Sequence, residues 1–291
     1  MSKDIFELLR LHEHSFSKGQ RAIARYITEC YDKAAFMTAN RLGKTVGVSE
    51  STVVRFAVEL GYDGYPALQK AMQEMVLGRL TSVQRMEVAN DRLTGRDVLS
   101  TVLHSDMEKL RQTAETVNRE DFQSAVDAVL GARRVYIVGV RSTAPLATFL
   151  GYYLRYMLPD VRVVTASGTS EMHEQLIGVD SRDAVLAFSF PRYSTSTGRG
   201  AKFCRDNGAK VIGITDSRLS PLGIQCDHVL TCKSDMISLV DSLTAPLSIA
   251  NALIVAIASH RERELEKTLG ALERTWEQYH VYENRGPGNE L

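Results

Sequence analysis

Two turns carry residue types that recognise anions and sugar hydroxyls, and each turn follows a run of apolar residues. The first turn spans residues 139–143 and the second spans residues 189–197. Each contains an arginine, whose planar guanidinium can donate two parallel hydrogen bonds to a phosphate. If each turn opens a helix, the free N–H groups of that helix also point at the anion. The residues predicted to form this site are Gly139, Arg141, Ser142, Thr143, Ser189, Arg192, Ser194, Thr195 and Thr197.

Individual residues of these turns suit separate tasks. Gly139 lets the backbone approach a ligand, and Ser142 and Thr143 are predicted to cap the next helix. A third segment, residues 167–171, follows another apolar run and is predicted to complete the pocket. It adds Ser167, Gly168, Thr169 and Ser170. Ordinary capping explains Ser142 and Ser194 without a ligand, but two turns that each hold an arginine at neighbouring strand ends favour one.

An enzyme is the main alternative. A sugar isomerase needs a carboxylate or an imidazole to move a proton between two carbons of its substrate. Glu171, His173 and Glu174 are clustered near a predicted strand end. On a helix, however, these three residues also fit a solvated face. A third possibility, a protein that only shapes DNA and takes no effector, leaves both arginine-bearing turns unexplained.

The segment from Thr38 to Gly61 has the pattern of two short helices that cross at a steep angle. Ala39 is small enough for the helices to approach closely, and Gly47 permits a tight turn with a positive φ. Ser49 is predicted to cap the second helix. These features indicate a helix-turn-helix, in which the start of the second helix enters the major groove of DNA.

The exposed start of that second helix supplies the predicted DNA contacts. Ser49 and Thr52 suit phosphate contacts at a helix N-terminus. Arg55 can donate to guanine O6 and N7, while Glu50 can accept from a cytosine amino group or orient Arg55. The set predicted from this pattern is Thr38, Ser49, Glu50, Ser51, Thr52 and Arg55.

The elements that position these motifs fall into two patterns. Residues 1–78 are predicted to be helical, with caps at Ser17, Thr38 and Ser49 and a helix after Pro66. A polar linker is predicted at 79–95, and a second domain at 96–285 begins with two helices, the second behind an Asn118 cap. Five short apolar runs then alternate with helical segments, which is typical of a parallel sheet covered on both faces. The runs are 135–139, 161–165, 184–188, 211–215 and 228–231; a helical stretch from Asp241 and a tail at 286–291 follow.

Composition sets limits on the class of protein. The 291 residues have a net charge of zero, 44% apolar and 24% charged residues, as in ordinary globular proteins. The stretch 18–55 holds seven basic and three acidic residues, a net +4 that suits phosphate contacts. The four cysteines do not have the spacing of a metal site. The apolar stretch 245–258 is too polar and too short to span a bilayer. No secretion signal is found at the start of the sequence. We therefore expect a cytoplasmic protein with free thiols, no cofactor and no metal.

The motifs resemble a known family. Residues 47–55 look like the recognition segment of lac-repressor-type regulators. The wider segment resembles the N-terminal domain of the RpiR family of bacterial regulators, through Ser17-Lys-Gly-Gln-Arg, Ala35-Phe-Met-Thr38 and Leu60-Gly-Tyr-x-Gly-Tyr-Pro66. By that analogy Tyr62 and Tyr65 add backbone contacts to DNA; the alternative is that both pack against the recognition helix.

The resemblance implies an all-α helix-turn-helix domain joined to an α/β sugar-isomerase (SIS) domain with a flavodoxin-like, doubly wound parallel sheet of five strands. Gly139, Arg141 and Ser142 match the first phosphosugar-binding turn of that domain. The second turn, usually Ser-x-Ser-Gly-x-Thr, keeps only its first serine and lacks the glycine, so Arg192 is expected to replace backbone donors. We expect a regulator of carbohydrate genes that binds pseudo-palindromic DNA as a homo-oligomer and takes a sugar phosphate or related carbohydrate derivative as effector. Whether it represses or activates is left open.

Overall fold

The structure, a computed structural model, describes residues 5–77, 83–84, 86, 94–95, 97–166, 168–236 and 240–282. The chain divides into two compact units, Met1–Val102 with Met236–Asp241, and Leu103–Asp235 with Ser242–Leu291. Most of the predicted linker at 79–95, the predicted tail at 286–291 and the predicted site residue Ser167 lie outside the described residues.

The N-terminal unit is helical, as predicted. Its helices are α1 (Ile5–His12), α2 (Lys18–Glu29), α3 (Tyr31–Ala34), α4 (Ala39–Val46), α5 (Glu50–Glu59) and α6 (Tyr65–Leu77). The short α3 was not predicted, because it follows α2 directly after the Cys30 cap and its four residues carry no periodic signal. The three predicted caps are confirmed: the hydroxyls of Ser17, Thr38 and Ser49 each accept a backbone N–H from the first turn of their helix.

Helices α4 and α5 cross closely. Gly47 ends α4 with a φ of +77°, as the predicted tight turn requires. Gly43 also allows a close approach, since a Cβ there would lie 2.8 Å from the carbonyl oxygen of Val48 in the turn. Val53 lies in one buried apolar cluster to which the helices of this unit contribute, and Ala39 is buried in the same cluster.

The C-terminal unit contains a five-stranded parallel sheet in the order β2-β1-β3-β4-β5, which confirms the predicted fold class. Its strands are β1 (Arg134–Val138), β2 (Val161–Val164), β3 (Asp183–Phe188), β4 (Lys210–Thr215) and β5 (His228–Thr231). Its helices are α8 (Val98–Thr116, which begins in the other unit), α9 (Arg119–Gly131), α10 (Ala144–Leu154), α11 (Thr169–Leu176), α12 (Thr195–Asp206), α13 (Thr244–His260) and α14 (Glu262–Gln278), with the 3-10 turns η1 (Arg141–Thr143) and η2 (Gly223–Gln225).

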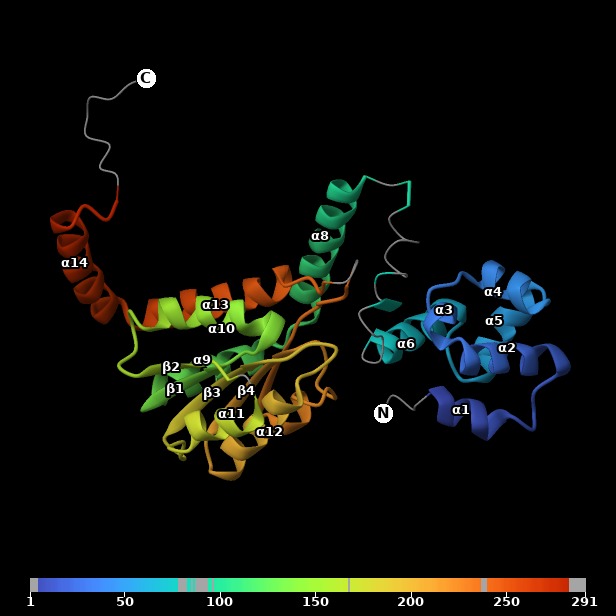
Figure 1. The fold of residues 1–291 in the computed structure, drawn as a ribbon, viewed down its shortest axis with the longest axis horizontal. Helices are drawn as coiled ribbons and strands as arrows, with labels where there is room; N and C mark the ends of the chain where they lie inside the picture. Colours follow the sequence, from blue (N-terminus) through green and yellow to red (C-terminus); the bar gives the residue numbers. More distant parts are fainter. Residues whose placement is uncertain are drawn as a thin grey trace, which may run out of the picture. The chain divides into compact units, whose positions relative to one another are not determined.

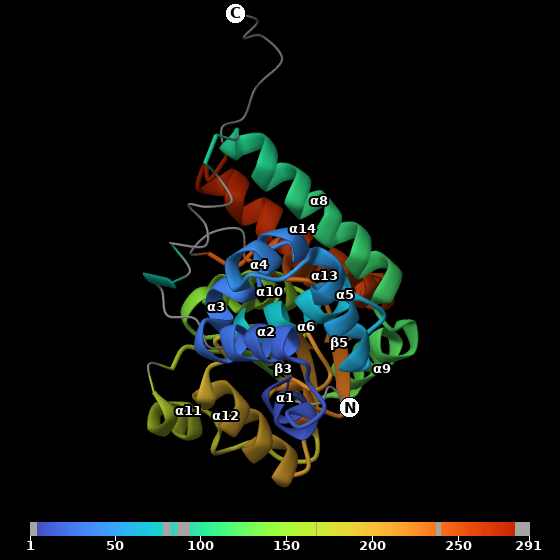
Figure 2. The ribbon, with the colours of Figure 1, turned by 90° about the vertical axis from the view of Figure 1, so that its right-hand side faces the viewer.

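Helices cover both faces of the sheet (Figure 1). Helices α9, α10 and α13 pack on one face around a large apolar cluster, and α11 and α12 pack on the other face around a second cluster. Figures 1 and 2 show α11 and α12 side by side. The buried strands explain why β1 and β3 are almost wholly apolar in sequence.

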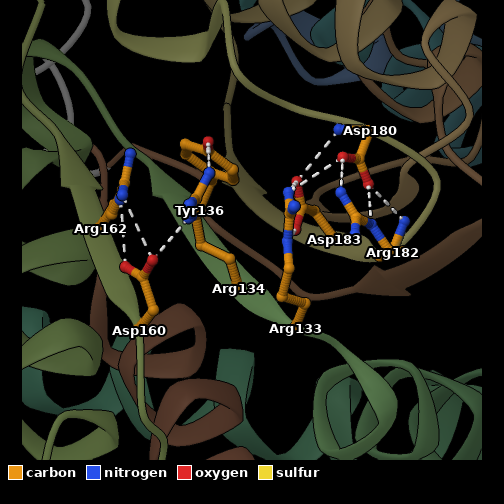
Figure 3. A network of polar contacts seen from close by, with 8 residues as sticks. All are labelled: Arg133, Arg134, Tyr136, Asp160, Arg162, Asp180, Arg182 and Asp183. Carbon is orange, nitrogen blue, oxygen red and sulfur yellow. Dashed lines mark hydrogen bonds and ion pairs between the residues drawn. The ribbon is translucent and has the colours of Figure 1, made fainter.

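Ion pairs close the amino edge of the sheet, where the strands begin (Figure 3). Arg133 donates two hydrogen bonds to Asp183, at 3.0 and 2.8 Å, and the Asp183 side chain is fully buried. Arg134 bonds both Asp160 and the hydroxyl of the buried Tyr136. The Arg162 and Arg182 side chains, which are more exposed, also bond carboxylates of this edge, so all four arginines of the network are paired.

Candidate effector-binding and DNA-binding sites

The turns that follow β1 and β3 lie next to each other, because these strands are neighbours in the sheet. In this strand order the chain turns to opposite sides of β1, and such a switch point leaves a crevice at the carboxyl ends of the two strands. The hydroxyl of Thr143 links the turns directly: it lies 2.9 Å from the Val140 carbonyl oxygen and 3.4 Å from that of Phe188 at the end of β3. The two turns singled out in the sequence therefore meet.

Both predicted arginines adopt a left-handed backbone conformation. The φ of Arg141 is +56° and that of Arg192 is +66°. Such a conformation costs a residue with a side chain about 1–2 kcal/mol, and such strain gathers at ligand-binding sites. Both side chains are exposed, and the Arg141 guanidinium makes no hydrogen bond or ion pair with any described residue. Arg141 is thus available to an anion.

Two roles predicted for the first turn need correction. Thr143 is the N-cap of α10 by position, but neither its hydroxyl nor that of Ser142 caps the helix; Thr143 is buried and bonds carbonyl oxygens instead. Gly139 serves internal packing, because a Cβ there would lie 2.7 Å from the Thr143 carbonyl oxygen and 2.9 Å from the Ala147 Cβ. The glycine therefore lets the end of β1 approach α10. Ser142 itself is exposed.

The second and third segments also meet. The hydroxyls of Thr169, in the first turn of α11, and Ser196, in the first turn of α12, lie 3.0 Å apart. The N-termini of two helices therefore converge, and each adds a partial positive charge and free N–H groups. Gly168 is the N-cap of α11 and has open space around its α-carbon. The Ser170 hydroxyl is occupied, since it donates to Glu174 at 3.1 Å.

In the first turn of α12 one buried hydroxyl has no partner. Ser194 caps this helix by accepting the backbone N–H of Thr197, and Thr195 is exposed beside it. Thr197 is fully buried, and its Oγ1 makes no hydrogen bond within the part of the chain that the structure describes. A buried hydroxyl without a partner costs free energy, so this atom marks a position where a bound ligand can supply one.

Ser189 and Tyr193 extend the second turn toward β4. Ser189 is buried and its backbone N–H donates to the Ile214 carbonyl oxygen at 3.2 Å. The Tyr193 hydroxyl lies 2.9 Å from both carboxylate oxygens of Asp216, which directly follows β4. Burial raises the pKa of Asp216 above its ordinary value, against the opposite effect of its hydrogen bonds from Tyr193, its own backbone and Thr215. Sequence reasoning missed this pair; the polar Thr215-Asp216-Ser217 run after an apolar strand was the available signal.

In the helix-turn-helix, the first turn of α5 presents an exposed polar surface. The Ser49 hydroxyl lies 2.9 Å from the hydroxyls of both Ser51 and Thr52, and Ser49, Glu50, Ser51 and Arg55 are exposed. Glu50 accepts a hydrogen bond from Asn40 of α4 at 3.1 Å, whereas Arg55 bonds the Ser51 carbonyl oxygen at 3.4 Å. Among these contacts Glu50 is held by α4 and does not orient Arg55. Thr38 is exposed at the start of α4.

Of the two tyrosines, Tyr65 belongs to the core. Its side chain is 3% exposed, and its hydroxyl donates to the Met37 carbonyl oxygen at 2.7 Å. Burial raises the pKa of this phenol strongly. The packing alternative therefore holds for Tyr65, and the predicted DNA contact is wrong. Tyr62 is half-buried and packs against the same apolar cluster.

Comparison with known proteins explains both units. A model of the helix-turn-helix domain of the rpiR family matches residues 3–76, and a model of the SIS domain matches residues 129–256. This chain belongs to the rpiR family. It is 25% identical over 232 residues to an uncharacterized HTH-type transcriptional regulator of Clostridium perfringens, across 79% of this chain and 82% of that protein.

Solved structures show the same folds. The sugar isomerase domain of an RpiR transcription factor from Sphaerobacter thermophilus is 26% identical, covers 61% of this chain and 98% of that chain, and has a TM-score of 0.58. The Vibrio vulnificus NanR protein complexed with ManNAc-6P is 19% identical, covers 97% of this chain and 100% of that chain, and also has a TM-score of 0.58. The two family models and these structures together give the chain a helix-turn-helix domain followed by a SIS domain.

In this rpiR-family chain the three residues considered for proton transfer are engaged in local contacts. His173 Nδ1 lies 2.7 Å from the Thr169 carbonyl oxygen, and its ring packs edge-on against Phe203. Glu171 accepts a bond from Gln175, and Glu174 accepts one from Ser170. These contacts are those of an ordinary helix surface. All four cysteines are free, and no helix among the described residues is long and apolar enough to cross a membrane.

Proposed function

We propose that this chain regulates transcription by binding operator DNA through α5 and a phosphorylated sugar, or a related carbohydrate derivative, at the carboxyl edge of its sheet. The arginine geometry carries the effector half of the proposal. Arg141 and Arg192 stand at the ends of two neighbouring strands, both with positive φ, and both are exposed. Strain of this kind persists only where the surroundings hold it. Two exposed arginines in neighbouring turns can bind one anion through charge-assisted hydrogen bonds.

Three further groups favour a phosphate. The N-termini of α11 and α12 converge at the contact between Thr169 and Ser196, and a helix N-terminus attracts anions through its free N–H groups and its dipole. The buried, unpartnered hydroxyl of Thr197 is a ready hydrogen-bond donor beside them. In this proposal Arg141 and Arg192 neutralise the anion, while Ser142, Gly168, Ser189, Ser194 and Thr195 contribute hydroxyl and backbone contacts. NanR, whose structure contains ManNAc-6P, supports the phosphosugar class.

The DNA half rests on the first turn of α5. Ser49, Ser51, Thr52 and Thr38 supply hydroxyls for phosphates, while Arg55 and the Asn40-held Glu50 read base edges. One short helix reads few bases, so two copies on a pseudo-palindromic operator are part of the proposal. A binding preference for one arrangement of the two copies then couples the effector to DNA affinity.

A double dissociation tests both halves at once. A thermal-shift screen against sugar phosphates, free sugars, inositols and amino sugars identifies a stabilising ligand. Arg141→Ala is expected to lower the affinity for that ligand roughly 100-fold, because charge-assisted hydrogen bonds to phosphate are lost. The same variant is expected to keep its affinity for operator fragments selected from a random DNA pool. Arg55→Ala is expected to do the reverse.

Arg162→Ala is the matched control, since it removes an exposed arginine from the opposite edge of the same sheet. It is expected to leave both the ligand response and DNA binding unchanged. A shift produced only by unphosphorylated compounds would refute the phosphate part of the proposal. Absence of any ligand response would remove the effector half, and loss of DNA binding in Arg141→Ala would contradict the assignment of separate sites.

A further inference from the structure

A chain of hydrogen bonds anchors the Arg192 turn to the neighbouring strand. The Tyr193 hydroxyl donates to Asp216, which also accepts the hydroxyl of Thr215 at 3.1 Å. The Thr215 hydroxyl lies 3.0 Å from that of Ser220, and Ser220 accepts the backbone N–H of Gly223 at 2.9 Å. Thr215 and Ser220 are both buried. The far end of this chain is therefore fixed in the core, and its near end is Tyr193.

Placing Asp216 here costs free energy, because its carboxylate is partly desolvated. Asp216 is half-buried, and its carboxylate makes no ion pair with any residue the structure describes, so hydroxyl and backbone donors alone hold it. A partly buried carboxylate without a cationic partner contributes little to folding. It is, however, a strong acceptor, and hydrogen bonds to charged groups are stronger than those between neutral groups.

The Asp216 carboxylate holds Tyr193, the residue next to Arg192. Arg192 has a φ of +66°, a conformation that a non-glycine residue leaves readily unless its surroundings maintain it. Fixing Tyr193 on Asp216 restrains the backbone immediately after that strained residue. We infer that Tyr193 and Asp216 are a positioning pair that holds the turn of Arg192 in its effector-binding conformation. This inference rests on the proposed function for the choice of ligand, but the restraint itself can be measured without any ligand.

The restraint is tested by native-state trypsin cleavage of the full chain after Arg192, followed by mass spectrometry. Tyr193→Phe removes the hydroxyl and keeps the ring. Losing a hydrogen bond to a carboxylate is expected to accelerate this cleavage on the order of tenfold, by increasing the population of the open turn. Tyr152→Phe, at an exposed tyrosine of α10, is the matched control and is expected to be cleaved at the wild-type rate.

Asp216→Asn separates positioning from general stability. The asparagine keeps one carbonyl acceptor for Tyr193, so an intermediate cleavage rate is expected, whereas Asp216→Ala should match Tyr193→Phe. The inference is overturned if Tyr193→Phe is cleaved like the wild type. It is equally overturned if Tyr193→Phe accelerates cleavage after all exposed arginines alike and lowers the melting temperature, because the pair would then only stabilise the fold.

A second arm uses N-acetylmannosamine 6-phosphate as the probe. Tyr193→Phe is expected to weaken the probe about tenfold, with Tyr152→Phe unchanged. If the wild type does not bind this probe but Tyr193→Phe is still cleaved faster, the chosen phosphosugar is wrong and the restraint is supported. Probe binding that is identical in wild type and Tyr193→Phe would show that the restraint does not serve effector binding.

Discussion

The two edges of the sheet use arginines in opposite ways. At the amino edge, Arg133 and Arg134 are saturated by carboxylates and a phenol, and the side chain of Asp183 is wholly buried by its pairing. At the carboxyl edge, Arg141 has no partner among the described residues and sits on a strained backbone. The same residue type therefore closes one edge and leaves the other open. We therefore expect Arg133 and Arg134 to contribute to stability at the start of the strands, and we propose that Arg141 serves recognition at their ends.

The largest expected effect contrasts the two edges directly. Arg133→Ala should lower the free energy of unfolding by roughly 2 kcal/mol, because it leaves the buried carboxylate of Asp183 without its cation. Arg141→Ala should change it by less than about 0.5 kcal/mol, because it removes an exposed side chain that makes no contact of this kind. Urea unfolding followed by the fluorescence of Trp276, the single tryptophan, reports on this unit.

A double substitution tests the mechanism. Arg133→Ala together with Asp183→Asn removes both charges, so it should recover part of the stability lost in Arg133→Ala. If Arg133→Ala and Arg141→Ala lower stability equally, the contrast between a closed and an open edge is wrong.

The sequence predicts the residues at the carboxyl ends of the strands better than the ion-pair network at their amino ends. Arg141 and Arg192 stand out because each follows an apolar run and shares its turn with hydroxyls, and parallel strands must bring such turns together. The amino-edge network includes pairs that are distant in the chain, such as Arg133 with Asp183, 50 positions apart. No local pattern marks such a pair, because its partners meet only once the strand order is set.

Side-chain roles within a turn are also beyond local patterns. Gly139 and Thr143 were expected to face a ligand and to cap a helix, but they pack against α10 and bond carbonyl oxygens. Asp216 was overlooked because its importance depends on Tyr193, a residue from another loop. In each case the residue type was informative and the direction of the side chain was not, since direction depends on tertiary packing.

Backbone strain at Arg192 should have a medium-sized effect on the free energy of unfolding. At Arg192, with its φ of +66°, Arg192→Gly should be about 1 kcal/mol more stable than Arg192→Ala, because only glycine adopts this conformation without a steric penalty. At Arg162, in β2, the order should reverse, because glycine weakens a strand. Urea unfolding of the four variants measures both differences.

The comparison within each pair removes the contribution of the arginine side chain itself. If Arg192→Gly is no more stable than Arg192→Ala, the left-handed backbone of the Arg192 turn is not strained, and one support for an effector site there is lost.

The smallest effects are in pH dependence, where the two edges should have opposite signs. Hydrogen bonds from Arg134 lower the pKa of Asp160, and those from Arg182 lower that of Asp180. Burial raises the pKa of Asp216. A lowered folded-state pKa contributes stability that is present above the ordinary value of about 3.9 and is lost as the pH falls through the folded-state pKa. A raised pKa does the reverse: the folded state holds the proton more tightly, so acidification through that pKa favours folding.

Variants at the two edges should therefore diverge as the pH changes. Asp180→Asn should be less stable than the wild type at neutral pH, with the deficit shrinking as the pH falls below about 4. Asp216→Asn should be at least as stable as the wild type at neutral pH, and its relative advantage should shrink as the pH falls through the raised pKa of Asp216. Carboxyl-carbon NMR titration of labelled aspartates gives the individual pKa values. An Asp216 resonance that titrates below those of Asp160 and Asp180 would contradict the expectation that partial burial raises the pKa of Asp216.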